Sequence, residues 1–284
     1  MKATTFSPFP SIMALAIVAT ALAAAAASQY GSRNENPAGG GFHRSEVFQM
    51  VQTKNDLNKA QNQAGRYAGN LRITSKLLAR DFTPGGNLNK AAWQAAEPVN
   101  FDRDALGRKQ FPESATRVAS LWSKRYVYFA YWCKYSTLNI YEGEDAAKER
   151  WELWNRDVVE VFINPQPERF NHYYEFEVAP NNQWIDLEID LDKTPFNSAG
   201  WDSGFEHATA IDALNHTWTC EMRIPMASMG VQQVKANSEW RLNFYRADGP
   251  GDDTKRRFLS WSLLPSSKLS FHQPGSFGII RFIK

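Results

Sequence analysis

Cysteine is scarce in this sequence: its 284 residues contain only Cys133 and Cys220. The chain can therefore form one internal disulfide at most. Both cysteines fall in segments predicted below as strands. An exported chain could oxidise them to a disulfide, whereas strand interiors also often hold cysteine as a small buried thiol, so both states stay open.

The sequence also has no large excess of positive charge. The sequence has 32 Lys and Arg residues against 30 Asp and Glu residues, a net charge of +2. This balance disfavours a dedicated nucleic-acid binder, which usually carries a concentrated basic face. The tight basic cluster from Lys255 to Arg257 directly follows Asp252 and Asp253 and predicts a solvated loop.

Long hydrophobic runs are absent except near the start of the chain, where Met1 and Lys2 precede an apolar stretch from Ile12 to Ala27. The stretch is rich in alanine and short for a bilayer span, which needs about 20 apolar residues. A basic start, a short apolar run and small residues at its end predict a signal peptide over residues 1–27 rather than a membrane anchor. No cysteine stands directly after the predicted cleavage site, which disfavours a lipoprotein anchor. We expect a secreted or periplasmic protein that is free of the membrane after cleavage.

Residues 28–70 contain little apolar surface. Their Asn, Gln, Gly and Ala, with the stretch Asn36 to Gly41, predict a flexible linker or a weak, loosely attached helix. From residue 71 to 284, short runs of Val, Ile, Tyr, Phe and Trp alternate with turn residues, which is typical of an all-β protein. We predict an antiparallel, jelly-roll-like β-sandwich with a few short helices.

Ten segments carry the strand pattern: Arg117 to Trp122, Tyr126 to Lys134, Asp157 to Ile163, His172 to Ala179, Gln183 to Asp190, Glu206 to Ile211, His216 to Ile224, Trp240 to Arg246, Phe258 to Trp261 and Phe277 to Ile283. Helical signal is limited to three short segments: Lys90 to Ala96, Asp145 to Trp151 and Met226 to Met229.

Alternation along three successive strands separates two faces. The first is apolar and is predicted to face the core: Val159, Val161, Ile163, Tyr174, Phe176, Val178, Ile185, Leu187 and Ile189. The second carries carboxylates and aromatics and is predicted to face solvent: Val158, Glu160, Phe162, Tyr173, Glu175, Glu177, Trp184, Asp186, Glu188 and Asp190. Glu160 stands out because its neighbours on that face are Val158 and Phe162. Such a carboxylate needs a polar partner, and a ligand hydroxyl is one candidate.

Aromatic rings beside carboxylates suit sugar binding, because a pyranose ring has an apolar C–H face and a rim of hydroxyls. The alternative for Glu175, Glu177, Asp186, Glu188 and Asp190 is that they only solubilise a sheet face. The sequence has no nucleophile elbow, no zinc-site spacing and no Gly-rich phosphate loop. We therefore predict a protein that is not an enzyme.

A series of motifs resembles the family 9 carbohydrate-binding modules over residues 71–284. They are GGNLNKAAWQAAEPVNF (Gly85 to Phe101), VASLWSKRYVYFAYWC (Val118 to Cys133), WNRDVVEVFINP (Trp154 to Pro165), WTCEMRIP (Trp218 to Pro225), LNFYRAD (Leu242 to Asp248), LSWS (Leu259 to Ser262) and FHQPGSFGIIRFIK (Phe271 to Lys284). The third looks like the family's Trp-x-x-Asp-x-x-Glu-x-Phe segment. Each motif is weak alone, and their order along the chain carries the resemblance.

The resemblance implies a β-sandwich that clamps a terminal sugar between two aromatic rings. The first ring would be Trp154, and Glu160 would bind the hydroxyls of a sugar stacked on it. The second aromatic position holds Phe271 rather than Trp, which shrinks the stacking surface. A polar amide position holds Tyr245, and an arginine position holds Glu177, which reverses a charge. The implied partner is an oligosaccharide or polysaccharide, in polysaccharide breakdown or uptake, with the recruitment of a glycosidase left open.

Three alternatives accompany this prediction. Structural calcium also occurs in the family, and Asp186, Asp190 and Asp192 could supply oxygen ligands, although they form no defined loop motif, so no cofactor is predicted.

A glycosidase would use Glu160 with Glu175 or Glu177 as its carboxylate pair. A b-type haem domain of similar fold would draw on Met222, Met226, Met229 or His272, whereas covalent haem is excluded by the lack of a C-x-x-C-H site.

Overall fold

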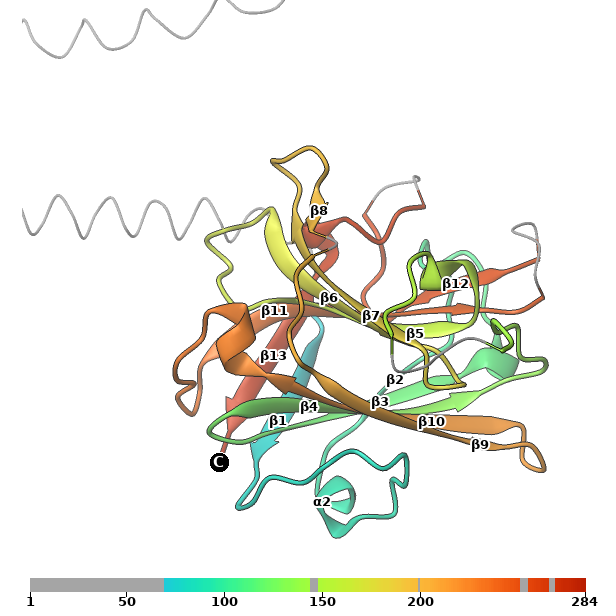
Figure 1. Ribbon diagram of the computed structural model, residues 1–284, viewed down its shortest axis with the longest axis horizontal. Coiled ribbons are helices and arrows are strands. Elements are labelled where there is room, and N and C mark those ends of the chain that lie inside the picture. Colours follow the sequence, from blue (N-terminus) through green and yellow to red (C-terminus); the bar gives the residue numbers. More distant parts are fainter. Residues whose placement is uncertain (1–68, 144–147, 199, 251–254, 266–268) are drawn as a thin grey trace, which may run out of the picture. The chain divides into compact units, whose positions relative to one another are not determined.

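The computed structural model describes residues 69–143, 148–198, 200–250, 255–265 and 269–284 (Figure 1). The predicted signal peptide lies outside the described residues, as do residues 28–68 of the predicted linker. The helices that are described include none both long enough and apolar enough to cross a bilayer.

Strands make up most of the regular structure, so the all-β prediction is confirmed. They are β1 (Arg72–Leu77), β2 (Val99–Phe101), β3 (Thr116–Trp122), β4 (Tyr126–Lys134), β5 (Val158–Asn164), β6 (His172–Val178), β7 (Trp184–Asp190), β8 (Asn197–Ser198), β9 (Glu206–Asp212), β10 (Thr217–Pro225), β11 (Glu239–Asp248), β12 (Arg257–Ser260) and β13 (Gly278–Ile283). The ten predicted strands are present with ends shifted by at most two residues, and β1, β2 and β8 were not predicted.

Helical structure is limited to short segments. They are the α-helix α2 (Ala91–Gln94) and the 3-10 turns η1 (Pro112–Ser114), η2 (Leu153–Asn155), η3 (Met226–Met229) and η4 (Pro274–Ser276). The expected helices at Lys90 to Ala96 and Met226 to Met229 correspond to α2 and η3. The expected turn at Asp145 to Trp151 falls partly on residues 144–147, outside the described part of the chain.

The strands form one continuous sheet in the order β8-β7-β6-β5-β11-β13-β1-β3-β4-β10-β9, with β12 on β11 and β2 on β3. The sheet is mixed, which corrects the antiparallel prediction: β1 runs parallel to both of its neighbours, β13 and β3. Its sequence RITSKL has only two aliphatic residues, Ile73 and Leu77, which explains why the apolar pattern did not reveal the strand. The sheet curls so that β5, β6, β7 and β11 lie over β3, β4 and β10 (Figure 1).

The main core fills the space between these two layers. Phe129 and Tyr131 of β4 contact the ring of Phe244 in β11, with centroids 5.5 and 6.0 Å apart. The hydroxyl of Tyr131 also donates a hydrogen bond of 3.1 Å to the backbone carbonyl of Glu160. The core therefore fixes β5 from the side opposite to the Glu160 side chain.

The prediction of which β7 side chains share a face with those of β5 and β6 is wrong. The β6–β7 register pairs Glu177 with Ile185 and Glu175 with Leu187, so the aliphatic residues of β7 share the glutamates' face. That face is not open to solvent, because Ile185 and Leu187 are buried there with Phe162 in a second apolar cluster. Alternation separates the two faces of one strand, but only the pairing register decides which faces of neighbouring strands coincide.

The two cysteines lie on the neighbouring strands β4 and β10 and are both free and buried. Of the two states that the sequence left open, the structure shows separate thiols. Burial raises the pKa of Cys133 to about 12, so this thiol stays protonated and unreactive at neutral pH.

Candidate functional site

A cavity of about 580 Å³ opens over the second apolar cluster, on the face of β5, β6 and β7 turned away from the main core. Its aromatic and aliphatic lining residues are Trp154, Phe162, Leu187, Phe196, Phe258, Leu269 and Phe271. Its polar lining residues are Asn155, Glu160, Glu175, Glu177, Asn197, Arg256 and His272. The cavity thus combines aromatic walls with three carboxylic acids.

Trp154 reaches the cavity from η2, the turn that leads into β5. Leu153 is buried beneath this turn, while Trp154 stays partly exposed and meets Trp151 edge-on at 5.1 Å. The aspartate three residues later, Asp157, anchors the turn: its Oδ2 accepts a hydrogen bond of 3.0 Å from the backbone N–H of Asn139. Burial raises the pKa of Asp157 to about 7. The Trp-x-x-Asp spacing therefore places a ring at the cavity and fixes its backbone.

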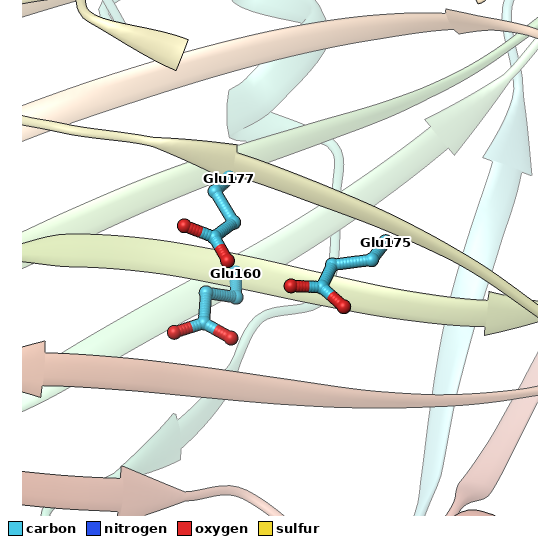
Figure 2. Close-up of side chains that lie close together, drawn as sticks. All are labelled: Glu160, Glu175 and Glu177. Carbon is cyan, nitrogen blue, oxygen red and sulfur yellow. The ribbon is translucent and has the colours of Figure 1, made fainter. Parts of the chain in front are cut away.

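Three glutamates come together within the cavity wall (Figure 2). Glu160 on β5 pairs directly with Glu177 on β6, and Glu175 lies two residues before Glu177 on the same face. One carboxylate oxygen from each lies within 4.8 Å of one from each of the others. The three residues are 2%, 3% and 0% exposed for Glu160, Glu175 and Glu177, so they are not surface charges.

The carboxylates have few hydrogen-bond donors. Within the described residues, neither oxygen of Glu177 has a partner, and Oε1 of Glu160 and Oε2 of Glu175 also have none. Burial raises the pKa of Glu160 well above its usual range, and the neighbouring charge of Glu175 raises it further. Burial does the same for the pKa of Glu177, with Glu160 and Glu175 adding to the effect. A ligand that donates hydrogen bonds would find unused acceptors here.

Arg256 supplies positive charge at this site. The residue is 8% exposed, and its Nη2 donates to the backbone carbonyls of Trp154 at 2.6 Å and Arg156 at 2.9 Å. Its guanidinium also lies 5.0 Å from the ring centre of Phe258. The prediction of a solvated loop at Lys255 to Arg257 is therefore wrong for Arg256, which fixes the backbone that carries Trp154. It is also wrong for Arg257, whose guanidinium pairs with Asp248 at 2.9 Å and with Glu113 at 2.6 Å.

Phe271 and Tyr245 form a stacked pair, with ring centres 4.1 Å apart and planes inclined by 12°. Only Phe271 lines the cavity; Tyr245 is fully buried beneath it and donates a hydrogen bond of 3.0 Å to the Phe271 carbonyl. Of the five predicted site residues, the structure thus brings four to one cavity: Trp154, Glu160, Phe271 and Glu177. Tyr245 supports the aromatic wall from behind.

Sequence reasoning left several cavity residues out of the predicted site. Phe162 and Glu175 were assigned to the same face as Glu160 and Glu177 but were not among the predicted saccharide-binding residues, although their spacing from Glu160 and Glu177 would have placed them beside those residues. His272, adjacent to Phe271, shares a hydrogen bond of 2.8 Å between its Nδ1 and the Tyr173 hydroxyl. This histidine was considered only as a haem ligand, although its neighbour Phe271 was predicted to line the site.

The sequence of residues 85–284 matches the family model described as carbohydrate family 9 binding domain-like. The chain belongs to this family. The predicted resemblance is therefore confirmed, and the matched segment holds every lining residue of the cavity. The family is one of binding modules.

Similar proteins agree with this membership. An "Extracellular protein" of Arthroderma benhamiae is 25% identical over 202 residues, which cover 67% of this chain and 87% of that protein. A crystal structure of a candidate carbohydrate-binding protein from Bacteroides uniformis matches with a TM-score of 0.61 at 17% identity, covering 76% of this chain and all of that one. A family 9 module from Caldicellulosiruptor kristjanssonii in complex with cellotriose matches with a TM-score of 0.53 at 15% identity, covering 75% and 94%. At these identities the structural matches show a shared fold.

The residues that were considered as haem ligands do not lie together in this family 9 domain. Met222, Met226 and Met229 are buried in the main core, whereas His272 lines the cavity, so the residues considered for haem lie apart.

The aspartates considered for calcium have protein partners. Asp186 accepts from the backbone N–H of Ser203 at 3.0 Å, Asp190 pairs with Lys193 at 3.1 Å, and Asp192 accepts from Asn171 at 2.6 Å. A calcium site at these aspartates stays a prediction.

Proposed function

We propose that this family 9 domain is an exported, non-catalytic module that binds the end of a saccharide chain in the cavity between Trp154, Phe271 and the glutamates. The observation that carries this proposal is the coexistence of aromatic walls with inward-facing carboxylate oxygens that lack donors. Aromatic faces pack against sugar C–H groups, and hydroxyls donate to carboxylates. Binding would serve polysaccharide breakdown or uptake.

The proposed roles follow from the positions of the side chains. Trp154 is partly exposed, and its backbone is fixed by Arg256, so its ring can stack on a sugar with little loss of freedom. Phe271 is supported by the stacked ring of Tyr245. Glu160 lies on β5 between Tyr245 on β11 and Glu177 on β6, and it would accept hydrogen bonds from the hydroxyl rim.

Export is supported by two observations. The apolar run near the start of the chain has the features of a signal peptide, and the Arthroderma benhamiae relative is described as extracellular. Detection of the protein in the culture medium or periplasm, with an N-terminus after residue 27, would test this part of the proposal.

The binding proposal is tested by calorimetric titration with glucose, cellobiose, xylobiose and a reduced disaccharide. Trp154→Ala and Glu160→Gln are expected to weaken saccharide binding at least about tenfold, since each removes a contact worth about 1.5 kcal/mol or more. Trp132→Ala is the matched control, because Trp132 is also partly exposed but lines a different groove, beside Arg117.

Unchanged affinity in both site variants would show that the ligand binds elsewhere. Loss of binding with the reduced disaccharide would establish a preference for chain ends. The same samples are expected to release no reducing sugar; release that Glu160→Gln abolishes would instead support the glycosidase pair considered above.

A further inference from the structure

The charge of the cavity goes beyond what a neutral sugar requires. Its described lining residues include three carboxylic acids, Glu160, Glu175 and Glu177, against one guanidinium, that of Arg256, and the imidazole of His272, whose Nδ1 lies 4.0 Å from Oε2 of Glu175. The Nη2 of this arginine donates to two backbone carbonyls, and its charge lowers the pKa of Glu160 and Glu177 but does not cancel the rise caused by burial. The hydroxyls of a neutral sugar can donate hydrogen bonds to carboxylates, but they bring no charge to balance them.

Buried carboxylates without donors are unfavourable, and a cation offsets both the missing donors and the charge. Glu177 is fully buried and lines the cavity, and neither of its oxygens accepts a hydrogen bond from an N–H or hydroxyl group of the described chain; its side-chain neighbour at hydrogen-bonding distance is another carboxyl, that of Glu175. The ligand that fits best therefore carries positive charge where the three carboxylates meet.

We propose that the cavity binds a saccharide with a free primary amino group, whose ammonium is held between Glu160, Glu175 and Glu177 while its ring contacts the aromatic walls. This inference rests on the proposed saccharide-binding function and narrows its ligand class to amino sugars.

The geometry suits an ammonium group. A primary ammonium has three N–H donors, and each of the three carboxylates offers one oxygen within 4.8 Å of the other two. Charge-assisted N–H···O contacts are about 2.8 Å long, so two oxygens that share one nitrogen are at most about 5.6 Å apart. The observed limit of 4.8 Å lies within this range.

The aromatic walls add attraction for the same charge. Phe162 follows Glu160 by two residues on the same face, and its ring lies in the cavity wall. An organic cation beside such a ring gains a cation–π interaction. A cavity of about 580 Å³ also has room for a sugar ring besides its amino group.

A divalent metal ion is the competing occupant, because calcium also binds carboxylate oxygens. Calcium takes six to eight oxygen ligands, whereas the remaining described lining is mostly aromatic and aliphatic and includes the cationic Arg256. An organic cation with a sugar ring fits both the carboxylates and the apolar lining. Binding of a metal ion is therefore treated as an alternative outcome of the test below.

The test is calorimetric titration of the purified protein with glucosamine, glucose and N-acetylglucosamine, near neutral pH with EDTA and then with calcium chloride. Glucosamine is expected to bind at least about tenfold more tightly than the other two, because acetylation removes the charge and glucose lacks the nitrogen. Glu175→Gln is expected to reduce glucosamine affinity more than glucose affinity. Glu188→Gln is the control, since Glu188 lies on β7 but on the opposite face, paired with His172.

Each other outcome overturns the inference in a distinct way. Equal affinity for the three sugars would refute the ammonium site while leaving saccharide binding intact. Binding that appears only with calcium would replace the ammonium with a metal. No binding of any of the three sugars in either buffer would refute the ammonium site, and if cellobiose and xylobiose also fail to bind, the saccharide-binding function itself is refuted.

Discussion

Replacing Glu177 with glutamine should stabilise the protein, and more so at high pH than at low pH. Glu177 is fully buried, neither of its oxygens has a partner within the described residues, and it lies beside Glu160 and Glu175. Burial and these neighbours raise the pKa of Glu177 in the folded state. Glutamine keeps the shape of the side chain, removes the charge and offers two N–H donors to the adjacent carboxylates.

The sign of the pH dependence follows from proton linkage. An acid whose pKa is raised on folding binds more protons in the folded state than in the unfolded state, over the interval between the two pKa values. The free energy of unfolding therefore falls as pH rises through that interval, and the full penalty is present above the folded pKa. Near pH 4 the carboxyl is protonated in the fold and the penalty is small. We expect Glu177→Gln to matter little there.

The size of the stabilisation depends on the free-energy cost of the buried Glu177 carboxylate, which the substitution removes. An unsatisfied buried polar group costs about 1–3 kcal/mol, and a charged one costs more. We therefore expect the free energy of unfolding to rise by about 1–3 kcal/mol at pH 8, and the midpoint of thermal unfolding to rise by about 2–4 °C for each kcal/mol.

Thermal and urea unfolding at pH 4 and pH 8, without ligand, measure this effect. Glu239→Gln is the control, because Glu239 forms an exposed ion pair with Arg72 and such pairs contribute about 0–1 kcal/mol. Equal destabilisation by Glu177→Gln at both pH values would refute the reasoning, since it would mean that the carboxylate has a stabilising partner in the folded protein.

Three further predictions concern the support of the site and the core. Tyr245→Phe removes the hydrogen bond to the Phe271 carbonyl but keeps the stacked ring, so it should lower the free energy of unfolding by about 1 kcal/mol and change saccharide affinity only a few-fold, by urea unfolding and calorimetry. Gly278→Ala should destabilise by about 1–3 kcal/mol in urea, because the added Cβ would lie 2.6 Å from the ring of Trp261; no loss of stability would contradict the packing described. Both cysteines are buried and free, so a thiol reagent should leave the native protein unmodified and label two thiols after denaturation, and a reducing agent should not shift the unfolding midpoint.

Much of the fold could be predicted from local patterns. The ten strands that were predicted carry clear alternation or dense β-branched and aromatic residues, and their ends were placed to within two residues. Strand β1 was not predicted because its sequence, RITSKL, is mostly polar. Its place in the sheet depends on β3 and β13, which are distant in the sequence. The parallel pairing, and with it the mixed sheet, could not be read from local sequence.

The candidate site was predictable where neighbours in sequence are also neighbours in space. Trp154 and Glu160 follow from one motif, and the spacing of Glu175 and Glu177 put them on one face. The role of Arg256 was hidden, because a basic cluster beside acidic residues has the same local pattern whether it is solvated or folded inward. The burial of the glutamates was hidden as well, since it depends on the register that brings Leu187 beside Glu175.

The place of β1 has a consequence for biosynthesis. This strand is among the first parts of the domain to leave the ribosome, yet one of its two neighbours, β13, is formed by residues 278–283, at the very end of the sequence given. The nascent chain must therefore carry β1 with an open edge until translation has passed that last strand, and exposed edges invite pairing with other chains. A polypeptide that stops before residue 278 also leaves the first part of β11, Glu239 to Leu242, without a partner on one side, while β12 still pairs with Tyr245 to Asp248. Completion of this sheet thus depends on the synthesis of β13, and products that stop before this strand should be recognised by chaperones and proteases as unfinished.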